Sequence, residues 1–265
     1  MGIQRLTAAD FGSRDREKSI AFILGCGSSI NLITDEQYEV IGKNLSIGIN
    51  QFFKNNRFSP DLLCLEGARP KEIKDLNEGH NPSDPWLEIQ ERYRSEVPPK
   101  LLIKDLHQLK FDNSIFSISS WQPNTKSIFT PPMALKSKDD LRSAIRQHWT
   151  ISNYFRFDLI FGIRGTLAFL IWLLAKAGYR KIVIMGVDLK GPYFFEDSDK
   201  IDHQIHPTLI EDKIEITIVD FLHCFAEFAE SELDVIINKS FCSDVIDLPE
   251  FNWSKEVSTS AMKSS

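Results

Sequence analysis

Small residues directly after an apolar run form the first stretch of this chain that could bind a ligand. The run "FILGCGSSINL" begins at Phe22, and its small residues include Gly25, Gly27, Ser28 and Ser29. Glycines let a backbone approach a ligand closely, and the free N–H groups at a helix start attract an anion. The full dinucleotide fingerprint would carry a third glycine where an isoleucine stands, so an ordinary strand-to-helix turn is the alternative.

A second small-residue turn precedes the most apolar segment of the chain. In "RGT", Arg164 and Gly165 lead to Thr166, which can cap the helix that follows. An arginine beside a helix start suits a phosphate or a carboxylate, and a plain helix cap is the alternative. Tyr193 adds a hydroxyl in the loop "GVDLKGPYFFED", although a loop tyrosine serves packing as often as binding.

Two histidines, His203 and His206, stand in "HQIH" within an aperiodic stretch. A His-x-x-His pair can bind a metal, but no cysteine or third histidine lies near it in the sequence, so no metal site is predicted. A histidine can also act as a general base near neutral pH. The alternative is a solvated loop histidine without a role.

The segments that must position these residues alternate between strand and helix patterns. Short apolar runs predict strands at 19–24, 45–50, 61–66, 100–104, 114–119, 181–189 and 233–238. Apolar spacing predicts helices at 29–40, 166–177 and 214–230, and a long loop fills 190–213. This alternation is typical of an α/β protein with a single Rossmann-like parallel sheet.

Polar residues stand where several of these strands end. Ligands of parallel α/β sheets bind beyond the carboxyl ends of the strands. The strand ends therefore add candidate binding residues to those in the two turns. They are Asn50, Gln51, Glu66, Asp188 and Asn238.

The composition limits the class of protein. The chain has 265 residues, 42% of them apolar and 26% charged, and its formal net charge of −6 excludes a general affinity for nucleic acid. The four cysteines form no CxxC pair, which argues against zinc and for reduced thiols in the cytoplasm. The first residues do not read as a signal peptide, and the most apolar run, Leu167–Ala175, is too short to span a membrane.

The same patterns predict the domain organisation. Residues 1–18 are polar and predict a loose N-terminal arm, and 254–265 predict a flexible tail. Residues 19–253 form the binding domain, with a flexible lid at about 190–213. The 19 phenylalanines predict a large aromatic core, and a hydrophobic acceptor surface is the less favoured alternative.

In their order along the chain, these motifs resemble glycosyltransferase family 42, the bacterial sialyltransferases. That family has a Gly-x-Gly-Pro-Ser-Leu turn, an Asn-Gln-Phe strand end and a Thr-Ser-Gly turn before an apolar helix. A Gly-Ile-Asp-Phe strand end with tyrosines and a lid histidine follow. The matching segments, spread over roughly residues 20–240, are "GCGSSINL", "GINQFF", "RGTLAFLIWLLAKAGYRKIVIMGVDL", "GPYFFED" and "IHPT".

The resemblance implies an inverting glycosyltransferase with a GT-A-type sheet. Such an enzyme moves a sugar acid from its CMP donor to a glycan acceptor, here with His206 as the general base and with neither a metal nor a cofactor. It implies that turns and strand ends bind the donor, through Gly25, Cys26, Gly27, Ser28, Asn50, Gln51, Glu66, Arg164, Gly165, Thr166, Asp188 and Tyr193. Lipopolysaccharide or capsule glycan synthesis in the cytoplasm is the expected setting. Attachment to the inner face of a membrane and a homo-oligomeric state are left open.

Departures from the family pattern leave the donor open. Cys26 replaces an asparagine, Ser28 replaces a proline, and Glu66 replaces the asparagine of the third strand. The sugar acid can therefore be a sialic acid, Kdo, pseudaminic acid or legionaminic acid, and His203 is an alternative base. Two other functions stay open, a pterin-type pyrophosphokinase that uses ATP and magnesium, and a non-catalytic nucleotide-binding protein.

Overall fold

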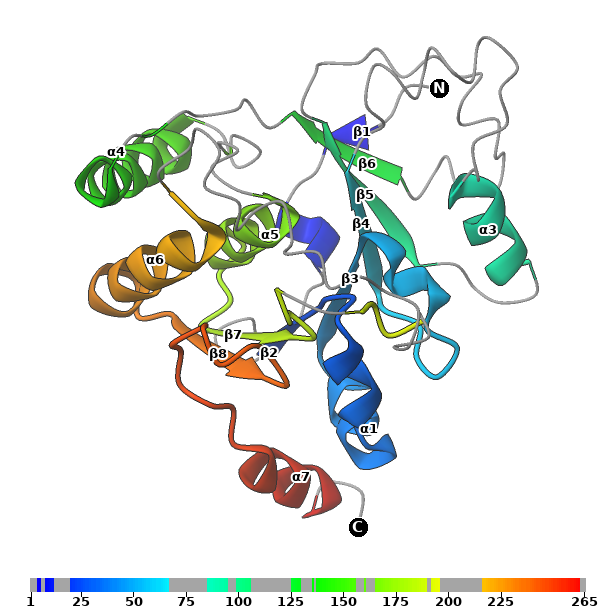
Figure 1. Ribbon diagram of the computed structural model, residues 1–265. Helices are drawn as coiled ribbons and strands as arrows, with labels where there is room; N and C mark the ends of the chain where they lie inside the picture. Colours follow the sequence, from blue (N-terminus) through cyan, green and yellow to red (C-terminus); the bar gives the residue numbers. More distant parts are fainter. Residues whose placement is uncertain are drawn as a thin grey trace, which may run out of the picture.

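A single parallel sheet forms the centre of the protein (Figure 1). The computed structural model describes residues 4–5, 8–11, 20–66, 85–94, 99–105, 125–129, 135, 137–155, 160, 165–189, 192–195 and 216–262. Within these residues the strands are β1 (Gln4–Arg5), β2 (Ile20–Leu24), β3 (Leu45–Ile49), β4 (Leu62–Glu66), β5 (Lys100–Asp105), β6 (Thr125–Phe129), β7 (Lys181–Met185) and β8 (Ile236–Ser240). Their order is β1-β6-β5-β4-β3-β2-β7-β8, and each neighbouring pair is parallel. The predicted α/β class with one parallel sheet is confirmed.

Two directions of winding meet between β2 and β7. The chain steps from β2 through β3, β4 and β5 to β6 on one side, and from β7 to β8 on the other. β2 and β7 pair in register, from Ile20 opposite Lys181 to Leu24 opposite Met185. Open α/β sheets bind their ligands at such a switch point, beyond the carboxyl ends of the strands. The turn after β2 therefore lies where a ligand is expected.

Helices cover both faces of the sheet (Figure 1). One face packs against α5 (Gly165–Lys176) and α6 (Ile218–Leu233), and α4 (Lys138–Phe155) packs on α6. The other face packs against α1 (Asp35–Gly42), α3 (Pro85–Arg92) and α7 (Trp253–Met262). Three short 3-10 helices are η1 (Ala8–Phe11), η2 (Ser28–Leu32) and η3 (Asn50–Lys54).

Helix α5 accounts for the most apolar run of the sequence. Every residue from Thr166 to Ala175 is buried, because the helix lies between the sheet and α6. Trp172 of α5 lies 5.2 Å from Phe225 of α6, and Trp149 of α4 lies 6.1 Å from Trp172, measured between ring centroids. The predicted aromatic core is therefore present, in the layer between these three helices.

The first α-helix begins later than the apolar spacing indicated. Residues Ser28–Leu32 form η2, and α1 starts only at Asp35. Thr34 caps α1, since its Oγ1 accepts from the Gln37 N–H at 3.3 Å and the Gln37 side chain accepts from the Thr34 N–H at 2.9 Å. This capping box fixes the helix start. The prediction that an α-helix begins at the glycine turn is wrong.

Parts of both chain ends pack on the domain. β1 pairs with β6, and Phe11 is buried with its carbonyl oxygen 2.9 Å from the Tyr179 hydroxyl that donates to it. At the other end, residues 253–262 form α7, and Trp253 Nε1 donates to Ser240 Oγ at 2.8 Å. Phe11 and Trp253 therefore anchor the described parts of both ends to the domain, and the loose arm over 1–18 and flexible tail over 254–265 stay predictions.

Two further differences concern the later part of the chain. α6 runs to Leu233 and ends at Asp234, whose φ of 55° is left-handed, so β8 covers Ile236–Ser240 instead of 233–238. Asn238 consequently lies inside β8, where its amide donates to the Pro249 carbonyl at 3.2 Å.

The segment 114–119 and most of 190–213 lie outside the described residues. Among the described helices, none is both long and apolar enough to cross a membrane.

Candidate functional site

The ends of β2 and β7 are hydrogen-bonded beyond the strands themselves. Gly25 N–H donates to the Met185 carbonyl at 2.7 Å, and Gly27 N–H donates to the Gly186 carbonyl at 2.8 Å. A Cβ on Gly25 would lie 2.9 Å from the Gly186 carbonyl carbon, and Gly186 itself has a φ of +66°. The glycines are therefore needed for the close approach of two strand ends, and their N–H groups are already used.

The turn after β2 holds the carboxylate of Asp188. Ser28 Oγ donates to Asp188 Oδ2 at 3.2 Å, and the Ser29 N–H donates to the same oxygen at 3.0 Å. The Ser29 hydroxyl contacts Asp188 Oδ1 and also lies 2.6 Å from the Phe241 carbonyl oxygen. A side chain at Gly27 would collide with the Asp188 carboxylate. The anion that the sequence led us to expect in this turn is thus supplied by the protein itself.

Cys26 points toward the end of β3. Its Sγ donates to the Ile49 carbonyl at 3.0 Å, and burial raises the pKa of the thiol to about 12. The thiol is therefore a neutral hydrogen-bond donor that joins two strand ends. Ile49 is followed by Asn50, which has a left-handed φ of 49°, and the side chains of Asn50 and Gln51 are exposed at the edge of the sheet.

Residues 192–195 lie directly on this turn. Tyr193 forms an isolated antiparallel bridge with Gly27, and the Phe194 N–H donates to the Cys26 carbonyl at 3.0 Å. The Tyr193 ring is 40% exposed and stacks on Phe195, with ring centroids 5.4 Å apart. The structure therefore brings Tyr193, Asp188 and Asn50 to the carboxyl edge at the switch point, as the motifs predicted.

The predicted turn at Gly165 also lies at the carboxyl edge of the sheet, at the start of α5. Gly165 begins α5 with a φ of +61°, and α5 leads into the start of β7, so the N-terminus of α5 lies at the carboxyl edge. Thr166 is 5% exposed, which leaves little of it open to a ligand. Arg164, His203, His206 and the side chain of Glu66 lie outside the described residues, and their predicted roles are untested.

The sequence analysis placed Ser29 in the turn without giving it a role, and it overlooked Lys54. Ser29 is the residue that ties Asp188 to the turn. Lys54 ends η3, and its ammonium lies 4.7 Å from the centroid of the Phe195 ring. Its positive charge lowers the pKa of the Cys26 thiol, against the larger effect of burial, so it acts close to the turn. The pattern "NQFFK" directly after β3 is the signal that could have pointed to Lys54.

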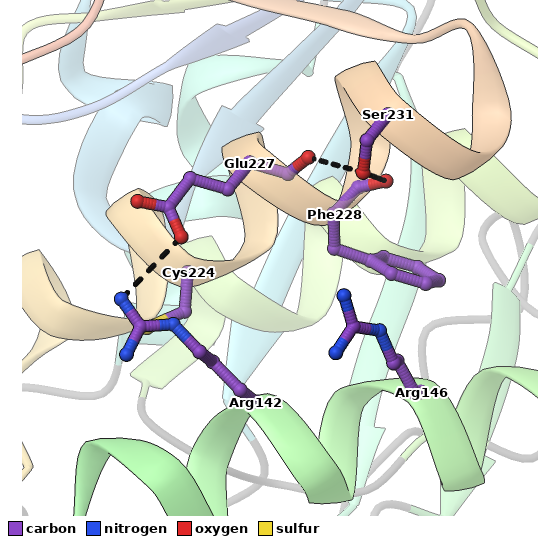
Figure 2. Close-up of a pocket in the computed structure, with 6 residues that line it drawn as sticks. All are labelled: Arg142, Arg146, Cys224, Glu227, Phe228 and Ser231. Carbon is purple, nitrogen blue, oxygen red and sulfur yellow. Dashed lines mark hydrogen bonds and ion pairs between the residues drawn. The ribbon is translucent and has the colours of Figure 1, made fainter.

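A pocket of about 60 Å³ lies elsewhere, between α4 and α6 (Figure 2). Arg142 and Arg146 of α4 point toward α6 there, and each is paired with an acid, Glu227 and Glu232 respectively, at 3.4 Å. Its other lining residues are Cys224, Phe228 and Ser231. No predicted site residue lines this pocket, and both arginines already form ion pairs with glutamates of α6. Among the described residues, no group of three or more His, Cys, Asp or Glu side chains is arranged to hold a metal.

No protein-family model and no curated protein sequence matches the chain. Among solved structures, it is similar to an α-2,3-sialyltransferase from Campylobacter jejuni in its apo form, at 12% sequence identity and a TM-score of 0.45, over 94% of this chain and 88% of that one. It is also similar to the monofunctional α-2,3-sialyltransferase Cst-I of Campylobacter jejuni, at 12% identity and a TM-score of 0.46, over 96% of this chain and 90% of that one. The α/β fold class is established by the strand order and not by these similarities.

Proposed function

We propose that the protein is an inverting, sialyltransferase-like glycosyltransferase. It moves a sialic acid or a related 2-keto sugar acid from a CMP donor to a glycan acceptor, without a metal or a cofactor. The observation that carries this proposal is the Asp188 carboxylate clamped at the switch point between β2 and β7. A fixed carboxylate at this place in an α/β sheet suits the hydroxyl groups of a nucleotide ribose.

The donor lies across the turn in this proposal. Asp188 and the Ser28 hydroxyl face the ribose, because a carboxylate accepts from hydroxyl groups and repels a phosphate. The exposed amides of Asn50 and Gln51 lie on the β3 side and are assigned to the nucleotide. The Tyr193 hydroxyl is assigned to the phosphate, and Arg164, Gly165 and Thr166 to the sugar acid by the resemblance.

The transfer needs a base, stabilisation of the leaving phosphate and a dry site. His206 takes the proton of the acceptor hydroxyl, whose oxygen attacks the anomeric carbon of the sugar acid. The bond from that carbon to the phosphate oxygen breaks, and CMP leaves with the electron pair. One displacement inverts the configuration. We place this reaction in the cytoplasm, in lipopolysaccharide or capsule glycan synthesis.

A thermal-shift titration with CMP, compared with ATP and magnesium, tests the nucleotide assignment. CMP without metal should raise the melting temperature. A shift with ATP and magnesium alone would instead support a pyrophosphokinase and reject the transferase. Turnover of CMP-activated sugar acids with glycan acceptors separates an enzyme from a nucleotide-binding protein without activity.

A further inference from the structure

Three N–H groups of the turn after β2 are already used within the protein, although the proposed donor carries a phosphate. The N–H groups of Gly25 and Gly27 bond to the end of β7, and the Ser29 N–H bonds to Asp188. Asp188 adds a negative charge to the turn, and the whole chain has a net charge of −6. A phosphate at this edge therefore needs a cation on the side of the turn that faces away from Asp188.

We propose that Lys54 binds the phosphate of the donor nucleotide, an inference that rests on the proposed function. Within the described parts of the connections that follow β2, β3 and β7, the lysine and arginine side chains are Lys43, Lys54 and Arg57. Lys43 lies at the far end of α1, where the chain enters β3. Lys54 is the one whose ammonium contacts the 192–195 segment, which is itself bonded to Cys26 and Gly27.

The Lys54 ammonium is held in place before any ligand binds. It lies 4.7 Å from the Phe195 ring centroid and 5.9 Å from the Phe53 ring centroid. Cation–π contacts of this kind limit the freedom of a long side chain. Because the Tyr193 ring stacks on Phe195, the Tyr193 side chain and the Lys54 charge lie around one aromatic ring. We therefore assign both groups to the same phosphate.

Glu88 of α3 serves as the resident counter-ion of Lys54. Its Oε2 lies 3.1 Å from Lys54 Nζ, and the two side chains are 32% and 43% exposed for Lys54 and Glu88. An ion pair with this exposure contributes little to stability, so exchanging its carboxylate for a phosphate costs little. A phosphate offers more charge and more acceptor oxygens than one carboxylate. Ligand binding thus replaces Glu88 as the partner of Lys54.

Arg57 provides a matched control on the same connection. Its guanidinium pairs with Asp35 at 2.7 Å and lies 5.0 Å from the Tyr38 ring centroid, so it too combines an acidic partner with aromatic contact. Those partners belong to α1, away from the 192–195 segment. Replacing Lys54 or Arg57 by methionine changes the net charge of the protein by the same amount. Only the removal of Lys54 should change phosphate binding.

Calorimetric titration with CMP and with cytidine tests the inference. Lys54→Met keeps the packing on the aromatic rings and removes the charge, and it should raise the Kd for CMP about 10- to 100-fold. The Kd for cytidine, which lacks the phosphate, should not change. Lys54→Arg should restore most of the CMP affinity, and Glu88→Gln should tighten CMP binding about two- to fivefold, because a competing partner is lost. Arg57→Met should bind CMP as the unmodified protein does.

The possible outcomes test the proposed function and the phosphate-binding role of Lys54 separately. If the unmodified protein does not bind CMP, the proposed function fails and this inference fails with it. If it binds CMP and Lys54→Met binds equally well, the inference alone is overturned. A Lys54→Met variant that binds CMP normally but loses affinity for an intact CMP-sugar acid would move Lys54 from the phosphate to the sugar carboxylate, which also rejects the inference as stated. Equal losses for CMP and cytidine would reveal a structural role.

Discussion

The two flanks of the turn after β2 hold their charges in different ways. On the β7 flank, Asp188 accepts hydrogen bonds from two serines of the turn, one of them through a backbone N–H. On the β3 flank, Lys54 is held by aromatic rings and one exposed carboxylate. The Asp188 carboxylate is fixed by hydrogen bonds from the turn, whereas the Lys54 ammonium can exchange Glu88 for another anion. A site with one fixed and one exchangeable charge can orient a ligand and still release it.

Neither flank carries the proposed base, so the largest effect is expected outside both. His206→Ala should lower turnover by about 10²–10⁴-fold, the usual contribution of a positioned base, with CMP binding preserved. The acidic limb of the pH–rate profile should disappear with the imidazole. Turnover of a CMP-sugar acid measures this. His203→Ala is the control. If His203→Ala is the variant that loses turnover, the base assignment moves by three residues. If neither variant loses turnover, the catalytic role proposed for this loop is wrong.

Cys26 joins the two flanks, and its thiol should be nearly inert in the folded protein. Its pKa is raised by burial from 9.0 to about 12, which lowers the thiolate fraction about 10³-fold near neutral pH. Alkylation at pH 8, followed by mass spectrometry of the Cys26 peptide, should be slower by about this factor than in the unfolded chain. Cys242, with a pKa of about 11, is the comparison and should react about tenfold faster than Cys26.

The same shift predicts the sign of a pH effect on stability. The folded state favours the protonated thiol, so the contribution of Cys26 is complete below pH 9 and is lost as the pH rises toward 12. Cys26→Ala should therefore show a weaker alkaline loss of stability in urea unfolding. An unchanged alkaline slope would mean that Cys26 is not buried as a neutral hydrogen-bond donor.

Removing the fixed charge of Asp188 should weaken nucleotide binding and abolish a preference for ribose over deoxyribose. Asp188→Asn should raise the Kd for CMP about tenfold, since a hydrogen bond to a charged group is lost. The unmodified protein should bind 2′-deoxy-CMP more weakly than CMP, and Asp188→Asn should no longer distinguish them. Calorimetry measures both. Tighter binding of CMP by Asp188→Asn would instead show that the carboxylate blocks a phosphate cradle in the turn.

The smallest effects concern the serines that fix Asp188. Ser29→Ala should lower the free energy of unfolding by about 1 kcal/mol, because Asp188 and the Phe241 carbonyl lose a shared hydroxyl. This corresponds to about 2–4 °C in melting temperature. Ser28 makes one weaker bond of 3.2 Å, so Ser28→Ala should cost less. Equal losses in calorimetric melting would indicate that the flank is not held mainly by Ser29.

The central strands were predictable because they are buried on both faces. β2, β4 and β7 appear as short, nearly continuous apolar runs, as parallel strands covered by helices do. Helix α4 was missed because charged residues such as Arg142 and Arg146 interrupt its apolar pattern. β6 was missed because "TKSIF" mixes polar and apolar residues. Packing against the rest of the fold, and not local propensity, defines both elements.

The candidate site was predictable in place but not in detail. Strand ends of a parallel sheet meet at one edge, so Asn50, Asp188 and Tyr193 were correctly placed together. The sequence could not show that the turn is filled by Asp188, because Ser29 and Asp188 are 159 positions apart. The pairing of Lys54 with Phe195 is equally non-local. The glycines of the turn were interpreted as ligand contacts, whereas the close approach of Gly186 and Asp188 is what requires them.

The pairing of β2 with β7 also determines when this protein can acquire its site during synthesis. Ile20 pairs with Lys181, and the Ser29 hydroxyl donates to the Phe241 carbonyl, so each contact can form only after the later residue has been synthesised. At ribosomal speeds of about 5–20 residues per second, the apolar strand β2 emerges on the order of 10 s before its neighbour exists. During that interval one edge of the nascent sheet has no partner. Chaperone dependence during translation, followed by rapid closure once β7 and β8 emerge, is the expected consequence for expression of this fold.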